Sequence, residues 1–339
     1  MPFNPANWNE QSNRFGDTVV IGNGASIAID GRLAYPSLYN AAIDNGHLDA
    51  QEQQIFEFFG TQDFEFVLRA LSHANSINQH LQIEETSTGD AYQSIKASLI
   101  ETVRGIHPEY ADVRDSLARA TQFLGHFRSV FSLNYDLFIY WAMMVGNEIA
   151  NCNRFKDCFV NGSFRTDYQD FRIPIDACDT TTLVFYPHGN LVLVTDMWGN
   201  ESKLKQNEQD LVRVITESWQ IGGDTPLFVS EGGWKRKQSA IGRNYYLQTV
   251  VNELAAPKTS VFAYGWNFGE QDRHLVRAIK KSGATLLGIS VYTGEGSDPD
   301  HFCYETSRQI TQQIGGIEVL YFDAADDGLW IHQDAPSEA

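Results

Sequence analysis

One stretch decides the fold of this chain: Thr18 to Ser26, with the sequence TVVIGNGAS. The β-branched run 18–21 predicts a short buried strand that ends in the turn Gly22-Asn23-Gly24. The following residues, 25–29, can open a helix. A strand, a glycine turn and a helix start in this order are typical of the first unit of a nucleotide-binding α/β fold.

Short apolar runs and helical periodicity alternate through the second part of the chain. We expect strands at 130–133, 182–186, 191–194, 227–229, 261–264, 285–291 and 319–322. We expect helices at 137–150, 208–217, 243–253, 272–281 and 304–314. This alternation predicts an α/β fold, a Rossmann-like parallel sheet with helices on both faces.

The region between Leu38 and Phe127 has a different character. Its segments 50–59, 64–74, 92–104 and 113–127 carry apolar residues at three- and four-residue spacing, and strand signals are nearly missing. This pattern predicts a helical insertion. The expected organisation is therefore a discontinuous Rossmann-type domain, residues 1–37 and 128–330, with an insertion at 38–127 and a tail at 331–339.

The charge balance argues against nucleic acid as a direct partner. The 339 residues include 25 Lys and Arg against 43 Asp and Glu, a formal net charge of −18. Such a surface repels a phosphate backbone. The one short basic run, Lys235-Arg236-Lys237, is interpreted as a solvated loop.

The sequence also bears on location and redox state. The first residues lack the basic-then-apolar order of a secretory signal, and the most apolar stretch, 130–146, is interrupted by Asn134 and Asp136. We therefore expect a soluble, cytoplasmic protein with no membrane association. Four cysteines form no Cys-x-x-Cys pair, so we expect free buried thiols and no zinc ribbon: Cys152, Cys158, Cys178 and Cys303.

Polar motifs follow several of the expected strands, and the first is the glycine turn. Glycines there let the backbone approach a pyrophosphate, and the helix N-terminus offers amide donors. A tight strand-to-helix connection is the alternative. A dehydrogenase of this fold would carry a third glycine and an acidic residue at the end of a second strand about twenty positions on. The third glycine is missing and no such strand is evident there, so hydride transfer is disfavoured.

The second motif is Ser132-Leu133-Asn134-Tyr135-Asp136, at the end of the strand 130–133. Residues just beyond the carboxyl end of a parallel strand face the ligand crevice. Asn134 suits ribose hydroxyls or a positioned water, and an Asx turn is its alternative role. Asp136 could instead cap the helix that begins at Leu137.

Two later motifs complete the set. His188, followed by Gly189, is a candidate general base after the strand 182–186, although a lone histidine is more often structural. The run from Tyr264 to His274 follows the strand 261–264, and we expect Asp272 to cap the next helix. Asp272 and His274 have no third ligand at useful spacing, so no metal site is expected.

Taken as an ordered set, Gly-Asn-Gly-Ala-Ser, Asn-Tyr-Asp, His-Gly and Gly-Trp-Asn resemble the sirtuin-like superfamily. More narrowly they resemble its bacterial branch associated with anti-phage defence. The resemblance covers residues 19–30 and 130 to about 322. It implies that Gly22, Gly24, Ala25 and Ser26 surround the NAD diphosphate.

The same resemblance implies roles for the remaining positions. Asn134 would lie at the nicotinamide ribose, with Asp136 supporting its loop, and His188 would be the catalytic base. Gly265 and Asn267 match a turn near the phosphates, although Trp266-Asn267 departs from the family's Gly-Thr-Ser pattern. Ser290 would lie near the adenosine.

The resemblance implies an NAD⁺ hydrolase that releases nicotinamide and ADP-ribose. Deacylases of the family carry a four-cysteine zinc module after the His-Gly motif, and here only Cys303 follows His188, so no zinc is expected. A non-catalytic NAD or ADP-ribose sensor, an NAD-dependent deacylase, an ADP-ribosyltransferase and a plain scaffold remain alternatives. Because NAD depletion kills a cell, we expect control by homo-oligomerisation, or by a companion ATPase or another defence protein docking on the insertion.

Overall fold

A parallel sheet forms the centre of the molecule. The computed structural model describes residues 3–34, 38–84, 86–175, 178–196, 198–204, 215, 217, 219, 225–228 and 234–332. In this part of the chain seven parallel strands pair in the order β12-β11-β10-β1-β2-β6-β3. They are β1 (Thr18–Ile21), β2 (Ser129–Ser132), β3 (Phe155–Lys156), β6 (Thr182–Phe185), β10 (Ser260–Tyr264), β11 (Leu286–Val291) and β12 (Glu318–Asp323). The predicted parallel α/β sheet is confirmed.

The central strand is β1, and it sets the position of the ligand crevice. The chain continues from β1 to its neighbour β2, whereas β10 pairs with the other edge of β1. The connections therefore diverge between β1 and β10. In open α/β sheets ligands bind outside the carboxyl ends of the strands at such a switch point.

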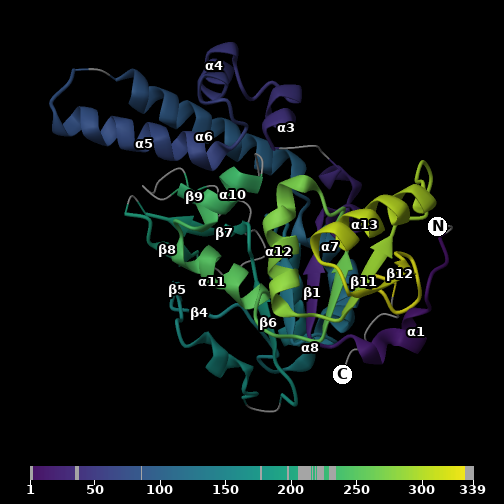
Figure 1. The fold of residues 1–339 in the computed structure, drawn as a ribbon. Coiled ribbons are helices and arrows are strands. Elements are labelled where there is room, and N and C mark those ends of the chain that lie inside the picture. Colours follow the sequence, from purple (N-terminus) through teal and green to yellow (C-terminus); the bar gives the residue numbers. More distant parts are fainter. Residues whose placement is uncertain are drawn as a thin grey trace.

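Helices cover both faces of this sheet, as expected. Figure 1 shows α12 (Arg273–Ser282) and α13 (Pro299–Gln313) in front of the sheet and α8 (Phe138–Ala150) behind it. The shorter elements near the N-terminus are α1 (Trp8–Gln11), η1 (Ser12–Arg14), α2 (Asn23–Ile29) and η2 (Gly31–Leu33). Trp8 of α1 contacts Phe262 of the sheet and Phe123 of the helical region, and its ring centroid lies 5.0 and 5.7 Å from theirs. Aromatic packing thus ties the N-terminus to the core.

The insertion is helical, as predicted. Its helices are α3 (Leu38–Asp44), α4 (Ala50–Phe59), α5 (Phe64–His80), α6 (Ser87–Ile106) and α7 (Tyr110–Gly125). Figure 1 shows α3 to α6 projecting from one end of the sheet. The last helix, α7, packs against the sheet instead, since Phe123 contacts Phe262 and Tyr264 at 5.8 Å.

Two predicted strands do not join the parallel sheet. Residues 191–194 belong to β7 (Gly189–Thr195), and 227–228 belong to β9 (Thr225–Phe228). With β8 (Glu201–Lys203) they form a separate antiparallel sheet in the order β8-β7-β9. Only residues 186–188 separate β6 from β7, which is too short for the crossover that a parallel neighbour needs. The predicted helix at 208–217, residue 229 and the tail from 333 lie outside the described residues, in whole or in large part.

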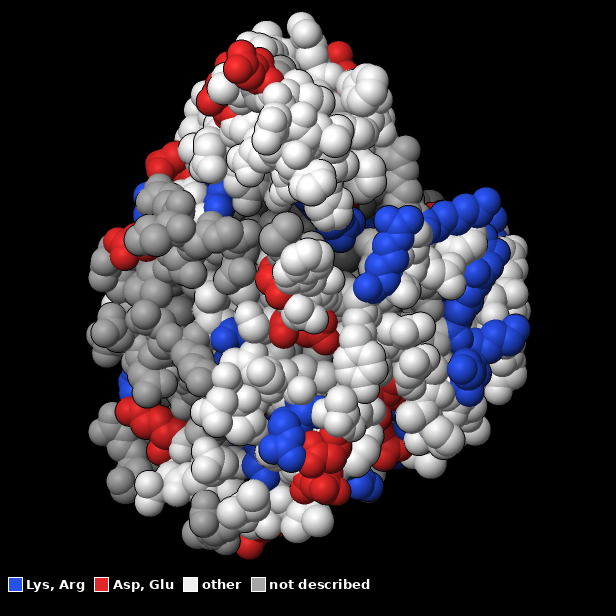
Figure 2. Space-filling model, turned by 90° about the vertical axis from the view of Figure 1, so that its left-hand side faces the viewer, with Lys and Arg blue, Asp and Glu red and all other residues white. Residues whose placement is uncertain are grey.

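Basic side chains gather on α12 and on α10 (Trp234–Ile241), although the chain is acidic. Four of them are exposed and have no acidic partner among the described residues: Lys235, Arg277, Lys280 and Lys281. Figure 2 shows Lys and Arg gathered in a strip along one side of the molecule. The guanidinium of Arg277 lies 4.4 Å from the centroid of the Trp234 ring.

The expectation of four free thiols is wrong for two of them. Cys152 and Cys178 form a disulfide, whereas Cys158 and Cys303 are free and buried. The parallel register explains the bridge, because Phe155 of β3 pairs with Thr182 of β6. Each cysteine precedes its strand by a few residues at the same end of the sheet. The expectation of free thiols relied on the missing secretory signal, which carries no information about how β3 and β6 pair.

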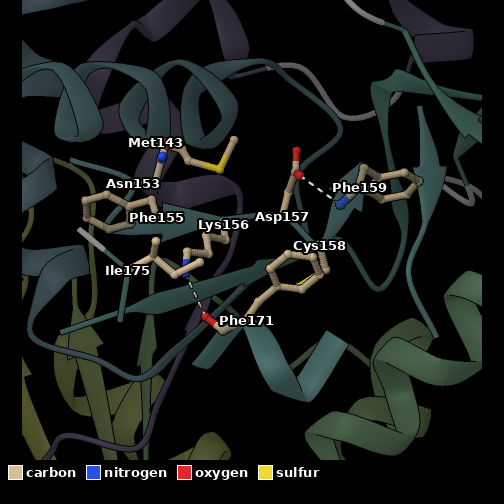
Figure 3. A pocket seen from close by; sticks show the side chains of 9 residues that line it. All are labelled: Met143, Asn153, Phe155, Lys156, Asp157, Cys158, Phe159, Phe171 and Ile175. Atoms are coloured by element: carbon tan, nitrogen blue, oxygen red, sulfur yellow. Dashed lines mark hydrogen bonds between the residues drawn. The ribbon is translucent and has the colours of Figure 1, made fainter. Parts of the chain in front are cut away.

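The segment that the disulfide encloses borders a cavity. It contains β4 (Phe159–Val160), β5 (Ser163–Phe164) and η3 (Tyr168–Arg172). Figure 3 shows the cavity, about 270 Å³ in volume, which is lined by Met143, Asn153, Phe155, Lys156, Asp157, Cys158, Phe159, Phe171 and Ile175. None of the residues predicted for the NAD site lines it.

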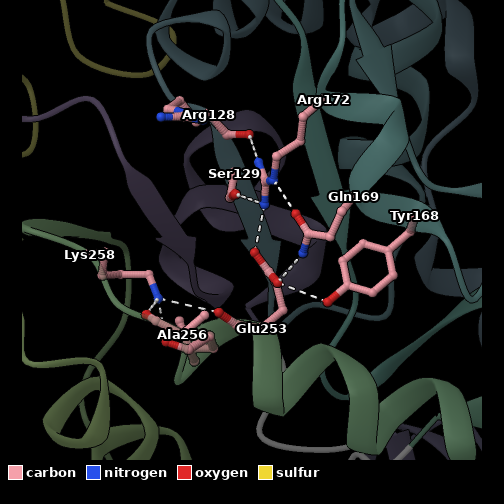
Figure 4. Close-up of polar contacts among 9 residues, drawn as sticks. Arg128, Ser129, Tyr168, Gln169, Arg172, Glu253, Ala256 and Lys258 are labelled. Atoms are coloured by element: carbon pink, nitrogen blue, oxygen red, sulfur yellow. Dashed lines mark hydrogen bonds and ion pairs between the residues drawn. The ribbon is translucent and has the colours of Figure 1, made fainter.

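A polar network fixes the same segment to the sheet. Glu253, near the end of α11 (Tyr245–Leu254), accepts hydrogen bonds from Tyr168, Gln169 and Arg172 over 2.6–2.8 Å (Figure 4). Arg172 also donates to the hydroxyl of Ser129 in β2, at 3.1 Å. The exposed fraction of the Arg172 and Glu253 side chains is only 19% and 11%. This pair is therefore shielded from water more than an ordinary surface ion pair.

Candidate functional site

The two glycine turns at the switch point contact each other directly. The amide of Gly22 donates to the carbonyl of Tyr264 at 2.9 Å, and the amide of Gly24 donates to the carbonyl of Gly265 at 2.8 Å. These turns follow β1 and β10, which are neighbouring strands. The predicted glycine-rich edge of the sheet is present.

The lack of side chains makes this contact possible. A Cβ on Gly265 would lie 2.3 Å from the amide nitrogen of Ala25, and one on Gly22 would lie 2.5 Å from the carbonyl oxygen of Gly265. Gly265 also has a φ of +64°, in the left-handed region. The amides of Gly24 and Ala25 already bond to Gly265 and Gly22. The glycines therefore have a packing role that does not depend on any ligand.

Three side chains beside the glycine turn form a buried hydrogen-bonded chain. The amide nitrogen of Asn134 donates to the carbonyl of Gly22 at 3.0 Å and to the hydroxyl of Ser26 at 2.7 Å. Ser26 in turn donates to the carboxylate of Asp136. Each of these residues is at most 6% exposed. Within the described residues, the side-chain oxygen of Asn134 accepts no hydrogen bond and stays available.

Asp136 is not the N-cap residue of α8, but it bonds to the first helical amide and to the loop beside it. Leu137 is the N-cap residue of α8, and the carboxylate of Asp136 accepts a hydrogen bond from the Phe138 amide at 2.9 Å. Its backbone carbonyl accepts a hydrogen bond from Asn190 at 2.6 Å. Burial raises the pKa of Asp136 to about 6, although the bonds from Ser26 and Phe138 act to lower it. Asp136 thus supports the Asn134 loop from inside the protein.

The insertion reaches this loop through His107, which sequence reasoning missed. The Leu137 amide donates to Nε2 of His107 at 3.0 Å, and Nδ1 of His107 lies 2.9 Å from the carbonyl of Pro108. Burial lowers the pKa of His107 to about 4, so the ring is neutral. A neutral ring with a proton on Nδ1 satisfies both contacts. The end of α6 therefore holds the start of α8.

His188 lies next to the Asn134 loop but is fully engaged. One ring nitrogen faces the backbone of Leu133, and Nε2 lies 3.1 Å from Nε2 of His274. Burial and the Lys237 ammonium hold the pKa of His188 well below its usual range. The ring is therefore neutral at neutral pH in this arrangement. Gly189 behind it has a φ of +77°, in the left-handed region.

A buried ion pair lies beside the two histidines. Lys237 of α10 donates to the carboxylate of Asp272 at 3.1 Å, and the indole of Trp266 donates to its other oxygen at 3.2 Å. The nearest oxygen of Asp272 lies 3.8 Å from Nε2 of His188. Burial raises the pKa of Asp272, but the pKa still lies below its usual value, and the charge and hydrogen bond of Lys237 are among the causes that lower it.

Two sequence interpretations change here. Lys237 is not in a solvated loop, because it lies on α10 and is 5% exposed. Its spacing to the buried Ile241 places both on the inward face of one helix, a signal that the basic run concealed. Asp272 occupies the N-cap position of α12 but makes no capping hydrogen bond, since its carboxylate serves Lys237 and Trp266.

The remaining predicted residues divide into two groups. Ser290 joins the site, because its hydroxyl accepts a hydrogen bond from the Gly265 amide at 2.9 Å. Asn267 stands apart: it is exposed, and its side chain accepts a hydrogen bond from the Gly269 amide at 3.0 Å. The structure therefore brings together every predicted site residue except Asn267. It adds Asn190, Lys237 and His274 to them.

The described residues show neither a metal cluster nor a membrane-spanning helix. Among the described residues, no group of three His, Cys, Asp or Glu side chains is arranged to hold a metal ion. In the same part of the chain, no helix combines the length and apolar character needed to cross a bilayer.

Fold and site together define an α/β protein with a Rossmann-like sheet and a cluster of buried polar side chains at its switch point. The chain belongs to a family described as Domain of unknown function (DUF4917), whose model matches residues 19–330. No curated protein matches the sequence.

Proposed function

We propose that this protein is a sirtuin-like NAD⁺ glycohydrolase that produces nicotinamide and ADP-ribose. One observation carries the proposal: Asn134, with an available side-chain oxygen, and His188 converge at the switch point of the sheet. Their loops are linked by the hydrogen bond of 2.6 Å from the Asn190 side chain to the Asp136 carbonyl. The His188 ring faces the backbone of Leu133, the residue before Asn134. The order of the sequence motifs is the second support.

Asn134 is the residue best placed to bind the substrate. Its amide nitrogen is committed to Gly22 and Ser26, so its orientation is fixed. The remaining oxygen can accept a hydrogen bond from a ribose hydroxyl or from the attacking water. A fixed acceptor lowers the barrier because its orientation is established before the reaction begins.

The proposed reaction is a substitution at the anomeric carbon of the nicotinamide ribose. The bond between this carbon and the nicotinamide nitrogen breaks, its electron pair stays on nicotinamide, and an oxocarbenium-like state forms. A water oxygen then bonds to the carbon and releases one proton. His188 is proposed to accept that proton, directly or through a water.

The test is incubation of the purified protein with NAD⁺ while nicotinamide and ADP-ribose are quantified. We expect Asn134→Ala and His188→Ala to lower the rate of release by about 10²–10⁴-fold, the range for loss of a positioning or acid–base group. His301→Ala, at an exposed histidine on α13, is the matched control and should leave the rate unchanged. Unchanged release in both site variants would refute the mechanism.

One observation favours a second candidate function, an NAD or ADP-ribose sensor. Nε2 of His188 is occupied by the contact with His274, and the other ring nitrogen faces the Leu133 backbone, so the described arrangement offers no free base. Saturable NAD⁺ binding without release of nicotinamide, under all conditions tried, would favour the sensor. Absence of both binding and release would contradict both functions.

An NAD⁺ hydrolase must be silent until it is needed, because NAD depletion kills the cell. We therefore propose a regulated effector of bacterial anti-phage defence, controlled by self-association or by a protein partner such as a companion ATPase. The contact between His107 and Leu137 supports the insertion as the place where a partner acts, since it links α6 to the loop of Asn134.

A further inference from the structure

The histidine pair and its ion pair form the most unusual group of side chains in the described structure. His188, Lys237, Asp272 and His274 are each 4–7% exposed. They come from the turn after β6, from α10 and from the start of α12. Buried ionisable groups are costly unless each has a partner. The positions of their protons therefore decide whether each group has a partner.

The proton arrangement follows from the Nδ1 atom of His274, which is buried and has no hydrogen-bond partner. A hydrogen on this atom would be an unsatisfied buried donor, so the neutral ring keeps its hydrogen on Nε2. The contact of 3.1 Å between the two Nε2 atoms needs one hydrogen, which then belongs to His274. The Nε2–H of His274 thus donates to Nε2 of His188, and the neutral His188 ring has its own hydrogen on the other nitrogen, which faces the Leu133 backbone.

The contacts of His274 agree with this assignment. Its Nδ1 is buried and faces the Gln271 backbone without forming a hydrogen bond of ordinary geometry. No contact therefore requires a hydrogen on Nδ1, and the neutral ring can keep its hydrogen on Nε2. Burial lowers the pKa of His274 to about 4, in line with a neutral ring.

The ion pair keeps both rings neutral. A lone Asp272 carboxylate, 3.8 Å from His188, would favour a protonated imidazole. The Lys237 ammonium binds the same carboxylate oxygen and offsets that attraction. The Trp266 indole fixes the second oxygen. Asp272 is therefore unable to turn His188 into a cation in this arrangement.

We propose that His274, Asp272 and Lys237 are positioning residues that hold His188 in an inactive form, with the Nε2–H of His274 covering the lone pair that would take the proton. His188 becomes a base only when His274 turns away. The catalytic consequence rests on the proposed NAD⁺ hydrolysis, whereas the proton arrangement does not. It explains how one site can be both assembled and silent.

The proton arrangement can be measured in the unmodified protein. Long-range ¹H–¹⁵N NMR of the histidine-labelled chain distinguishes protonated from unprotonated ring nitrogens. We expect His188 to carry its hydrogen on Nδ1 and His274 on Nε2, with neither ring titrating between pH 5.5 and 8 in this experiment. The exposed His301, which lies outside this cluster, serves as the internal control.

Three variants test whether His274 and its neighbours keep His188 inactive. In His274→Phe the lone pair of His188 is uncovered, so its titration midpoint should rise by at least one pH unit. In His274→Gln the side-chain amide can still donate, so the midpoint should stay low. Lys237→Met provides an independent route if the phenylalanine variant fails to fold, because loss of the ammonium leaves Asp272 free to raise the midpoint.

The catalytic consequence is a gain of activity. We expect His274→Phe to release nicotinamide from NAD⁺ at least tenfold faster than the unmodified protein, and the added change His188→Ala to abolish the gain. A His188 ring with its hydrogen on Nε2, or one whose midpoint does not respond to these variants, overturns the proposal. If the NMR results are as expected but no variant cleaves NAD⁺, the proton arrangement of His188 and His274 is supported and the proposed NAD⁺ hydrolysis is contradicted.

Discussion

At the residue scale, Gly265 meets two separate demands. Its left-handed φ of +64° disfavours any side chain, and its α-carbon lies against the backbone of Gly24 and Ala25. Gly283 at the end of α12 meets only the first demand, since its φ is +72° and nothing lies within 4 Å of a Cβ added there. Substitutions at the two glycines therefore distinguish the cost of left-handed backbone strain from the cost of steric overlap.

We expect Gly265→Ala to lower the free energy of unfolding by at least ~3 kcal/mol, because overlap is added to left-handed strain. Gly283→Ala should cost only ~1–2 kcal/mol, the strain alone. Urea denaturation followed by circular dichroism measures both. Equal losses in the two variants would show that the turns after β1 and β10 are less tightly packed than described.

Which site residues the sequence could reveal depended on where their partners lie. Asn134 and Asp136 were predictable because they directly follow a strand, and parallel strands end at one edge of the sheet. Asp272 was assigned to capping because that explanation needs only its local sequence. Its actual partner, Lys237, lies 35 positions away on another helix. A pairing at that distance leaves no periodic signal in a single sequence.

At the element scale, the contact between α6 and α8 deserves a test because it couples the insertion to the site. His107 is neutral when folded, with a pKa of about 4, and ionises near 6.5 when unfolded. Between these values acidification protonates only the unfolded chain, so His107 lowers stability as the pH falls. Asp136, with a folded pKa of about 6 against 3.8, has the opposite effect in the same window.

We expect His107→Phe to lower the free energy of unfolding at pH 7 by ~1–3 kcal/mol, since the Leu137 amide loses its acceptor. The loss should shrink as the pH falls from 6.5 to 4, because the variant lacks the proton uptake of unfolded His107. Urea titrations at pH 7, 5.5 and 4.5 measure this, with His301→Phe as the control. A loss that is constant with pH would contradict a buried neutral His107.

The positions of helices and strands were easier to predict from the sequence than the pairing of the strands in sheets. The run 18–21 matches β1 and 50–59 matches α4, since local composition decides such elements. Membership of the parallel sheet is decided by the length of the connection, and the short turn after β6 excludes β7 from it. Apolar content alone could not distinguish β7 from a strand of the parallel sheet.

At the scale of the whole molecule, the disulfide restrains a long edge segment. Cys152 and Cys178 are separated by 26 positions. The same segment is also held by Glu253, which accepts hydrogen bonds from Tyr168, Gln169 and Arg172. Loss of the disulfide should therefore destabilise the fold mainly because the unfolded chain gains conformational entropy. In the native state the segment should stay in place.

We expect the double variant Cys152→Ser/Cys178→Ser to lose ~3–4 kcal/mol of unfolding free energy, the chain-entropy value for a loop of this size. A reducing agent should cause a similar loss in the unmodified protein and none in the double variant. Thermal denaturation with and without the agent measures both. A melting temperature of the unmodified protein that is insensitive to reduction would contradict the bridge.

The contact between the two glycine turns also bears on how this family should be compared across genomes. Gly22 and Gly265 leave each other only the space of a hydrogen atom, so selection for a stable fold is enough to preserve them. Members that have lost all activity should still retain both glycines. Divergence at Asn134 and His188 would be the better guide to which descendants have changed their chemistry.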